Sequence, residues 1–112
     1  QKKREISKIR IDSTKVDSLE YKLIVFDPGF EAWLAMKPPK EFYSKSYYEL
    51  KNRLYVSEWN QRYLTSRNKG LYESYIDYSF VTDYGLDINY KLYYYFRYFE
   101  ETNKIKLYPA GR

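Results

Sequence analysis

The sequence contains no cysteine and no histidine, and only four glycines and four prolines in 112 residues. Without cysteine, disulfides and thiolate metal sites are excluded. Without histidine, the commonest general base is missing. The four glycines are too scattered to form a loop that cradles phosphate. These absences favour a binding or structural domain over an enzyme, and we predict no catalytic residue, no metal and no cofactor.

Long apolar runs are also missing. The longest is Leu23–Phe26, far short of the roughly 20 residues that cross a bilayer, so the sequence predicts no transmembrane segment. The chain begins with Gln1 rather than Met, and we expect that a preceding segment was removed. Whether that segment held a signal peptide or a lipid-anchored cysteine is left open.

Aromatic residues, by contrast, are abundant. Sixteen residues are tyrosine and 21% of the chain is aromatic. A tyrosine ring covers a large apolar area, yet its hydroxyl needs a polar partner. Such rings build a core and also serve recognition at a surface. A chain of 112 residues is long enough for one domain with a stable core.

The formal charge of +5 is unevenly distributed. Residues 1–18 carry six basic and three acidic groups, so only +2 belongs to the remainder of the chain. Domains that bind nucleic acid carry clustered basic residues on the folded body. The distribution therefore argues against nucleic acid as the main partner.

The pattern predicts a single α+β domain over residues 19–112, preceded by a flexible basic leader or tether over residues 1–18. Apolar residues alternate along Tyr21–Phe26 and again along Ile105–Tyr108, as expected for strands. We predict that these two strands, near the two ends of the domain, pair in a small sheet. Most of the core must then be helical.

Three helices are predicted between those strands. Asp27 is placed to cap the first, which runs to Met36 before two prolines. Ser44 is placed to cap the longest, over residues 45–67. Asp87 is placed to cap the last, which closes at residues 100–103. Between the last two helices, residues 71–84 suit a short turn followed by irregular chain.

Each of the two long helices has an expected core face. On the longest helix the predicted apolar residues are Tyr47, Tyr48, Leu50, Leu54, Tyr55, Trp59 and Tyr63. Its predicted solvent face includes Asn52 and Asn60. On the last helix the predicted core stripe is Ile88, Leu92, Tyr95, Phe96 and Phe99.

Four aromatic-rich strings identify a resemblance. They are YKLIVFDPGFEAWLAMKPPKEFYS, YVSEWNQRY, YIDY and DYGLDINYKLYYYF. Together they resemble a family of small, tyrosine-rich bacterial proteins of unknown function, over roughly Leu19 to Pro109. The resemblance implies no activity, ligand or catalytic residue. It does imply export and a cell-envelope location, often with a lipoprotein-type leader.

The candidate binding residues lie on the last helix. Successive helical residues point about 100° apart, so Tyr90 and Tyr94 must lean away from the core stripe. With Lys91 and Arg97 nearby, exposed rings would suit stacking and charge-assisted hydrogen bonds to a glycan or peptide. The alternative is that both rings pack against residues 71–84.

Two other groups of residues have simpler interpretations. Trp33 and Trp59 lie on apolar helix faces, which favours core positions over stacking platforms. The oxygen-bearing residues between the last two helices lack the spacing of a calcium loop, and we predict no metal there. They are Glu73, Asp77, Asp83, Asp87 and Asn89.

The sequence thus favours a non-enzymatic, envelope-associated domain that contacts a macromolecular partner, a protein or a glycan, through exposed tyrosines. A glycan-binding module is the first alternative, and a binder of single-stranded nucleic acid the second.

Overall fold

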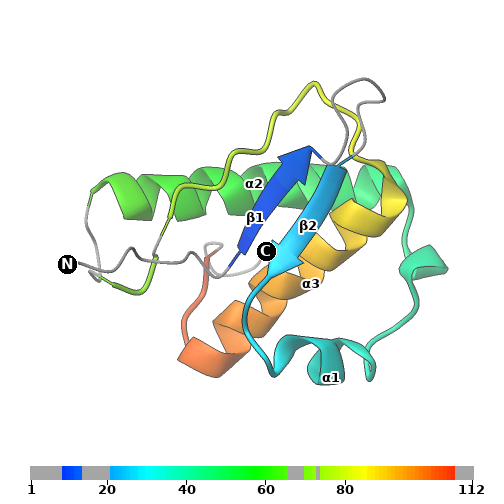
Figure 1. The fold of residues 1–112 in the computed structure, drawn as a ribbon, viewed down its shortest axis with the longest axis horizontal. Coiled ribbons are helices and arrows are strands. Elements are labelled where there is room, and N and C mark those ends of the chain that lie inside the picture. The colour runs from blue at the N-terminus through cyan, green and yellow to red at the C-terminus, as the bar shows by residue number, and fades with distance from the viewer. Residues whose placement is uncertain (1–8, 14–20, 66–69, 73, 108–112) are drawn as a thin grey trace.

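The computed structural model describes residues 9–13, 21–65, 70–72 and 74–107. Its elements (Figure 1) are β1 (Ile9–Ser13), β2 (Tyr21–Val25), α1 (Phe30–Leu34), the short 3₁₀ helix η1 (Lys40–Phe42), α2 (Lys45–Leu64) and α3 (Gly85–Asn103). The predicted α+β class with a mostly helical core is confirmed.

The helices α2 and α3 run side by side in the same direction. Along α2, the rings of Tyr48, Tyr55 and Trp59 meet rings progressively farther along α3, with centroid distances of 5.4 Å to Tyr93, 4.8 Å to Phe96 and 4.7 Å to Phe99. Because parallel helices begin at the same end, the chain between them must run back along their length (Figure 1).

That return connection includes residues 71–84, which we call the return segment; residue 73 is outside the described part. The Trp59 indole N–H donates to the Ser74 carbonyl at 2.8 Å. The Asn60 amide accepts from the Ile76 N–H at 2.8 Å and donates to the Ile76 carbonyl at 3.0 Å. As predicted, the described part of this segment contains neither helix nor strand.

The sheet differs from the predicted one. It pairs β1 with β2 in antiparallel register, with Ile9 opposite Val25 and Ile11 opposite Leu23. These four side chains face the helical core, and Ile9 is fully buried. The expectation that residues 1–18 have no buried element is therefore wrong at Ile9–Ser13, while residues 1–8 and 14–18 lie outside the described part.

The predicted C-terminal strand is also wrong. In the described part of that segment, Ile105–Leu107 pairs with no strand. Leu107 is instead buried against α3, and its amide donates to the Glu100 carboxylate at 2.8 Å. The Leu107 amide thus bonds to a side chain rather than to a neighbouring strand. The alternation of apolar residues in the sequence does not distinguish these two cases. Tyr108 lies outside the described residues.

One of the three predicted helix caps is confirmed. Ser44 caps α2 as predicted, accepting from the Tyr47 amide at 3.1 Å. Asp27 instead accepts from the Gly29 amide, and α1 begins only at Phe30. At α3, Asp83 rather than Asp87 accepts from the first amide, that of Gly85. Gly85 has a φ of 92°, a conformation that favours glycine.

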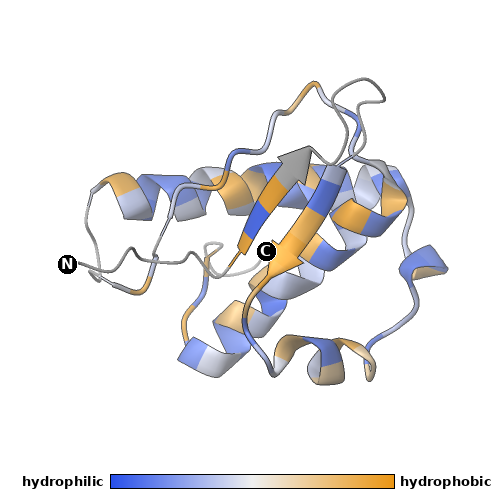
Figure 2. Ribbon diagram, viewed as in Figure 1, coloured by the Kyte–Doolittle hydropathy of each residue, from blue (hydrophilic) through white to orange (hydrophobic). Residues whose placement is uncertain are grey.

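On α2, the burial of two leucines and two asparagines is the opposite of the prediction. Leu50 and Leu54 are 57% and 45% exposed, whereas Asn52 and Asn60 are buried. Figure 2 shows apolar and polar residues interspersed along the visible part of α2. No helix in the described part is long and apolar enough to cross a membrane.

Candidate binding groove

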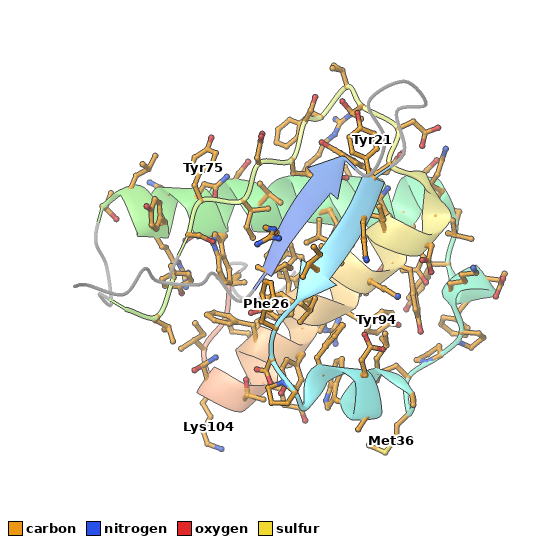
Figure 3. The ribbon with its side chains drawn as sticks, in the orientation of Figure 1. Tyr21, Phe26, Met36, Tyr75, Tyr94 and Lys104 are labelled. Carbon is orange, nitrogen blue, oxygen red and sulfur yellow. The ribbon has the colours of Figure 1, made fainter. Side chains whose placement is uncertain are left out.

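A groove of about 540 Å³ lies between α1 and the C-terminal half of α3. We call it the α1–α3 groove. Its floor is aromatic, because the rings of Trp33 and Tyr94 lie 6.3 Å apart. The lining residues are Trp33, Lys37, Tyr94, Arg97, Glu100, Glu101, Lys104, Ile105 and Lys106. Figure 3 shows Tyr94 between α3 and α1, and Lys104 at the far end of α3, pointing away from the body.

Both carboxylates of the groove are bound to other protein groups. Glu100 accepts from the Tyr55 hydroxyl at 3.1 Å and from the Leu107 amide at 2.8 Å. Glu101 accepts from the Trp33 indole N–H at 3.0 Å. These hydrogen bonds tie α1 and the segment after α3 to the last turns of α3. The acids thus hold the walls of the groove together.

The basic groups of the groove have no acidic partner at ion-pair distance within the described residues. They are Lys37, Arg97, Lys104 and Lys106. The Lys37 ammonium lies 4.4 Å from the centroid of the Trp33 ring, a cation–π distance. Arg97 donates to the Tyr93 hydroxyl at 3.0 Å. With four basic and two acidic side chains, the lining has a net positive charge.

The α1–α3 groove brings together two of the four predicted site residues. Tyr94 and Arg97 line it, but Lys91 and Tyr90 do not. The predicted exposure of the two rings is wrong: Tyr90 is 8% exposed and Tyr94 is 7% exposed. The alternative prediction, that the return segment covers these two rings, is also wrong.

The rings of Tyr90 and Tyr94 are covered by the chain from α1 to α2. The Tyr90 hydroxyl donates to the Pro38 carbonyl at 2.8 Å, and its ring lies 5.7 Å from that of Tyr48. Tyr94 packs against Tyr48 and Trp33. Burial raises the pKa of the Tyr94 hydroxyl, and nearby tyrosine hydroxyls raise it further.

The oxygen-bearing residues before and within the start of α3 are dispersed. Asp83 contacts the Lys45 ammonium at 2.9 Å, and Asp87 lies 3.9 Å from that of Lys40. Asn89 is buried, where it accepts from the Tyr78 hydroxyl. Asp77 is exposed and Glu73 is outside the described part. In the described chain, no cluster of potential metal ligands forms.

Sequence reasoning missed several of the groove residues. Trp59 is buried as predicted, but Trp33 is only half-buried and forms part of the groove floor. A signal for one wall was present, because Tyr94, Arg97, Glu101 and Lys104 recur at intervals of three and four. No comparable pattern identifies Lys37 and Lys106, which other segments contribute.

Comparison with known proteins adds a family but no activity. No curated protein and no solved structure matches this chain. The resemblance drawn from the aromatic strings is confirmed as far as membership of a family of unknown function. A family match covers residues 1–110, and the chain belongs to the family of unknown function DUF6146.

Proposed function

We propose that this domain is a non-enzymatic binding module that holds its macromolecular partner in the α1–α3 groove. The observation that carries the proposal is the set of four basic side chains, above an aromatic floor, that have no acidic partner at ion-pair distance in the described part of the chain. Charged groups without partners at a concave aromatic surface are typical of recognition sites. The recognising surface is thus this groove rather than the tyrosine run as a whole.

The chemistry of the groove supports binding over catalysis. Its described lining contains no serine or threonine and the sequence contains no cysteine or histidine, so the usual nucleophile and base are missing among these residues. Glu100 and Glu101 are held by three donors, which orients them as structural acceptors. A partner bound here meets cations and ring faces.

Trp33 provides a direct test. Its indole N–H donates to Glu101 at the groove, whereas Trp59 is buried between α2 and the return segment. We expect a partner to shift the Trp33 indole resonance in a proton–nitrogen correlation spectrum and to leave that of Trp59 unchanged. Titration with acidic and neutral peptides and polysaccharides, at two salt concentrations, would measure this. A Trp33→Phe variant assigns the resonance.

The outcome separates nucleic acid from an acidic partner held in the groove. Nucleic acid would bind with a steep salt dependence and would not need the groove. An acidic partner in the groove would also weaken with salt, but only moderately, because four cations contribute. If no partner in the panel shifts the Trp33 resonance, while one shifts residues elsewhere, this groove is not the binding site.

A second groove favours neutral glycan as the alternative function. It has a volume of about 440 Å³ and lies between α2 and the return segment, and none of the described residues that line it is charged. Tyr75 is 54% exposed there, and polar side chains such as Ser57 and Gln61 lie beside it. An exposed ring flanked by hydroxyls and amides suits a sugar. A Tyr75→Ala variant should then lose binding to neutral oligosaccharides without losing the Trp33 response.

We also propose a cell-envelope location, supported by the resemblance described above. Fractionation of cells that express the complete gene, followed by detection of the protein in membrane and soluble fractions, would test it. Recovery in the cytosolic fraction alone would contradict the proposal.

A further inference from the structure

The buried tyrosines of the core satisfy their hydroxyls within the protein. Seven of them exchange a hydrogen bond with a described group: Tyr48, Tyr55, Tyr72, Tyr78, Tyr90, Tyr93 and Tyr98. The partners include backbone carbonyls, carboxylates and arginine. This is the expected behaviour, because a buried hydroxyl without a partner destabilises the folded state.

Tyr94 departs from that behaviour. Its ring touches four other aromatic rings, those of Trp33, Tyr48, Tyr90 and Tyr93. Yet its hydroxyl makes no hydrogen bond with a described residue. In the described part, the side-chain atom that is both fully enclosed and without a hydrogen-bond partner is Asn52 Oδ1. The Tyr94 oxygen is not such an atom. Among the described residues, the Tyr94 oxygen is therefore neither hydrogen-bonded nor fully enclosed, and the Tyr94 side chain lines the α1–α3 groove.

The character of this hydroxyl is fixed by its surroundings. Burial raises the pKa of Tyr94, so the group stays protonated and can donate at neutral pH. The neighbouring groove residues Lys37 and Arg97 are also donors only. The three residues line the same groove, which therefore offers three donor side chains, two of them positively charged. The ligand group that complements them is an acceptor with negative charge.

We propose that Tyr94, Arg97 and Lys37 form an oxyanion subsite, which binds a carboxylate or phosphate group of the ligand in the α1–α3 groove. The proposal rests on the proposed function and specifies its ligand class. The Tyr94 hydroxyl donates to the oxyanion in place of water. Trp33 lies beneath the part of the ligand that carries the charged group.

Matched pairs of small probes test the subsite. Glucuronate and glucose share a ring but differ in the carboxylate, as N-acetylglutamate and N-acetylglutamine share a backbone and differ in charge. Inorganic phosphate provides the phosphate arm. We expect the charged member of each pair, and phosphate, to shift the Trp33 indole resonance saturably. The neutral member should shift it much less at equal concentration.

The hydroxyl itself is tested by two phenylalanine variants. Tyr94→Phe should weaken binding of the charged probes about tenfold, since a hydrogen bond to a charged group contributes on that order. It should leave the thermal midpoint unchanged, because no hydrogen bond within the protein is lost. Tyr90→Phe is the matched control: it removes a hydroxyl bound to the Pro38 carbonyl, so it should lower the midpoint and leave binding unchanged.

The possible results give distinct conclusions. Equal binding of the charged probes by native protein and Tyr94→Phe would overturn the role of Tyr94. Equal response to charged and neutral members would overturn the oxyanion subsite while leaving groove binding intact. If acidic polymers shift Trp33 but none of the small anions does, the groove binds its partner by another chemistry, and the subsite is again wrong.

Discussion

The two long helices hold the domain together in different ways. α3 contacts α1, β2, η1 and α2, and it is buried on most of its circumference. Its contacts with α2 are mainly ring against ring. α2 lies at the edge of the domain, with α3 on one side, the return segment on another and Leu50, Leu54 and Leu64 facing outward.

The difference shows what decides the residue type at each helix surface. Where α3 meets α2, packed rings dominate, and a buried polar contact joins them, from the Asn52 amide to the Asn89 carbonyl at 2.9 Å. Where α2 meets the extended return segment, it faces backbone amides and carbonyls that have no sheet partner. Those groups need donors and acceptors. The Asn60 side chain provides both, bonding to the two backbone groups of Ile76 as a neighbouring strand would.

The largest expected effect tests the ring interface of α3. Phe96 is fully buried and stacks on Tyr55 at 4.8 Å. Phe96→Ala should lower the free energy of unfolding by about 3–5 kcal/mol, as expected for removal of a buried ring. Denaturant melts measure this. The matched control is Phe42→Ala on η1, where the ring is exposed, with an expected change of about 0.5 kcal/mol.

The second effect tests the polar interface of α2. Asn60→Ala leaves the buried Ile76 amide without its partner, while the Ile76 carbonyl keeps its bond from the Tyr78 amide at 3.1 Å. The expected loss is about 1–3 kcal/mol, the cost of one unsatisfied buried group. Asn60→Leu should not restore it, because an apolar side chain offers no hydrogen bond. The neighbouring exposed Gln61→Ala should be nearly neutral, and recovery by leucine would show that packing rather than hydrogen bonding matters here.

The same difference between α3 and α2 explains how much of this architecture the sequence could predict. The stripe on α3 is predictable because a helix surrounded by side chains obeys hydrophobic periodicity. On α2, Asn52 and Asn60 were placed outside because asparagine is usually exposed. Their burial depends on Asn89 and on Ile76, which are distant in sequence. Such partners are known only once the helices are known to be parallel.

The sheet and the groove show a related limit. Ile9 and Ile11 alternate with Arg10 and Asp12, which is a strand signal, but the charged surroundings favoured a tether. In the groove, the face with Tyr94 and Arg97 was available from helical spacing. Trp33, Lys37 and Lys106 join it only through the tertiary contacts that bring α1 and the segment after α3 together.

A third effect, which depends on pH, tests the contact between the return segment and α3. The Tyr78 hydroxyl donates to Asn89 of α3 at 2.6 Å, and burial raises the pKa of Tyr78 to about 12. Between the usual pKa of about 10 and this value, the unfolded chain loses a proton that the folded protein keeps. Stability is therefore full below about pH 10 and falls as the pH rises toward about 12, by at most about 2.7 kcal/mol from this group.

Unfolding melts across that range, with phenolate absorbance as a second readout, would check the sign. Tyr78→Phe should be less stable near neutral pH, because the bond to Asn89 is lost, yet its stability should decline less steeply with rising pH. Other buried tyrosines, including Tyr94 and Tyr98, also have raised pKa values, so the variant should keep part of the slope. If the free energy of unfolding did not change with pH above about 10, the raised pKa values of the buried tyrosines would be contradicted.

The smallest expected effect concerns the outer side of α2. Leu50 and Leu54 face away from α3, and glutamine has nearly the same helix propensity as leucine. The double variant Leu50→Gln, Leu54→Gln should therefore change the free energy of unfolding by no more than about 0.5 kcal/mol per site. On α3, Leu92 is fully buried, and Leu92→Ala should cost about 2–5 kcal/mol. If the double glutamine variant lost as much as Leu92→Ala, the two leucines would be covered in solution. The contrast between a central and a peripheral helix would then fail.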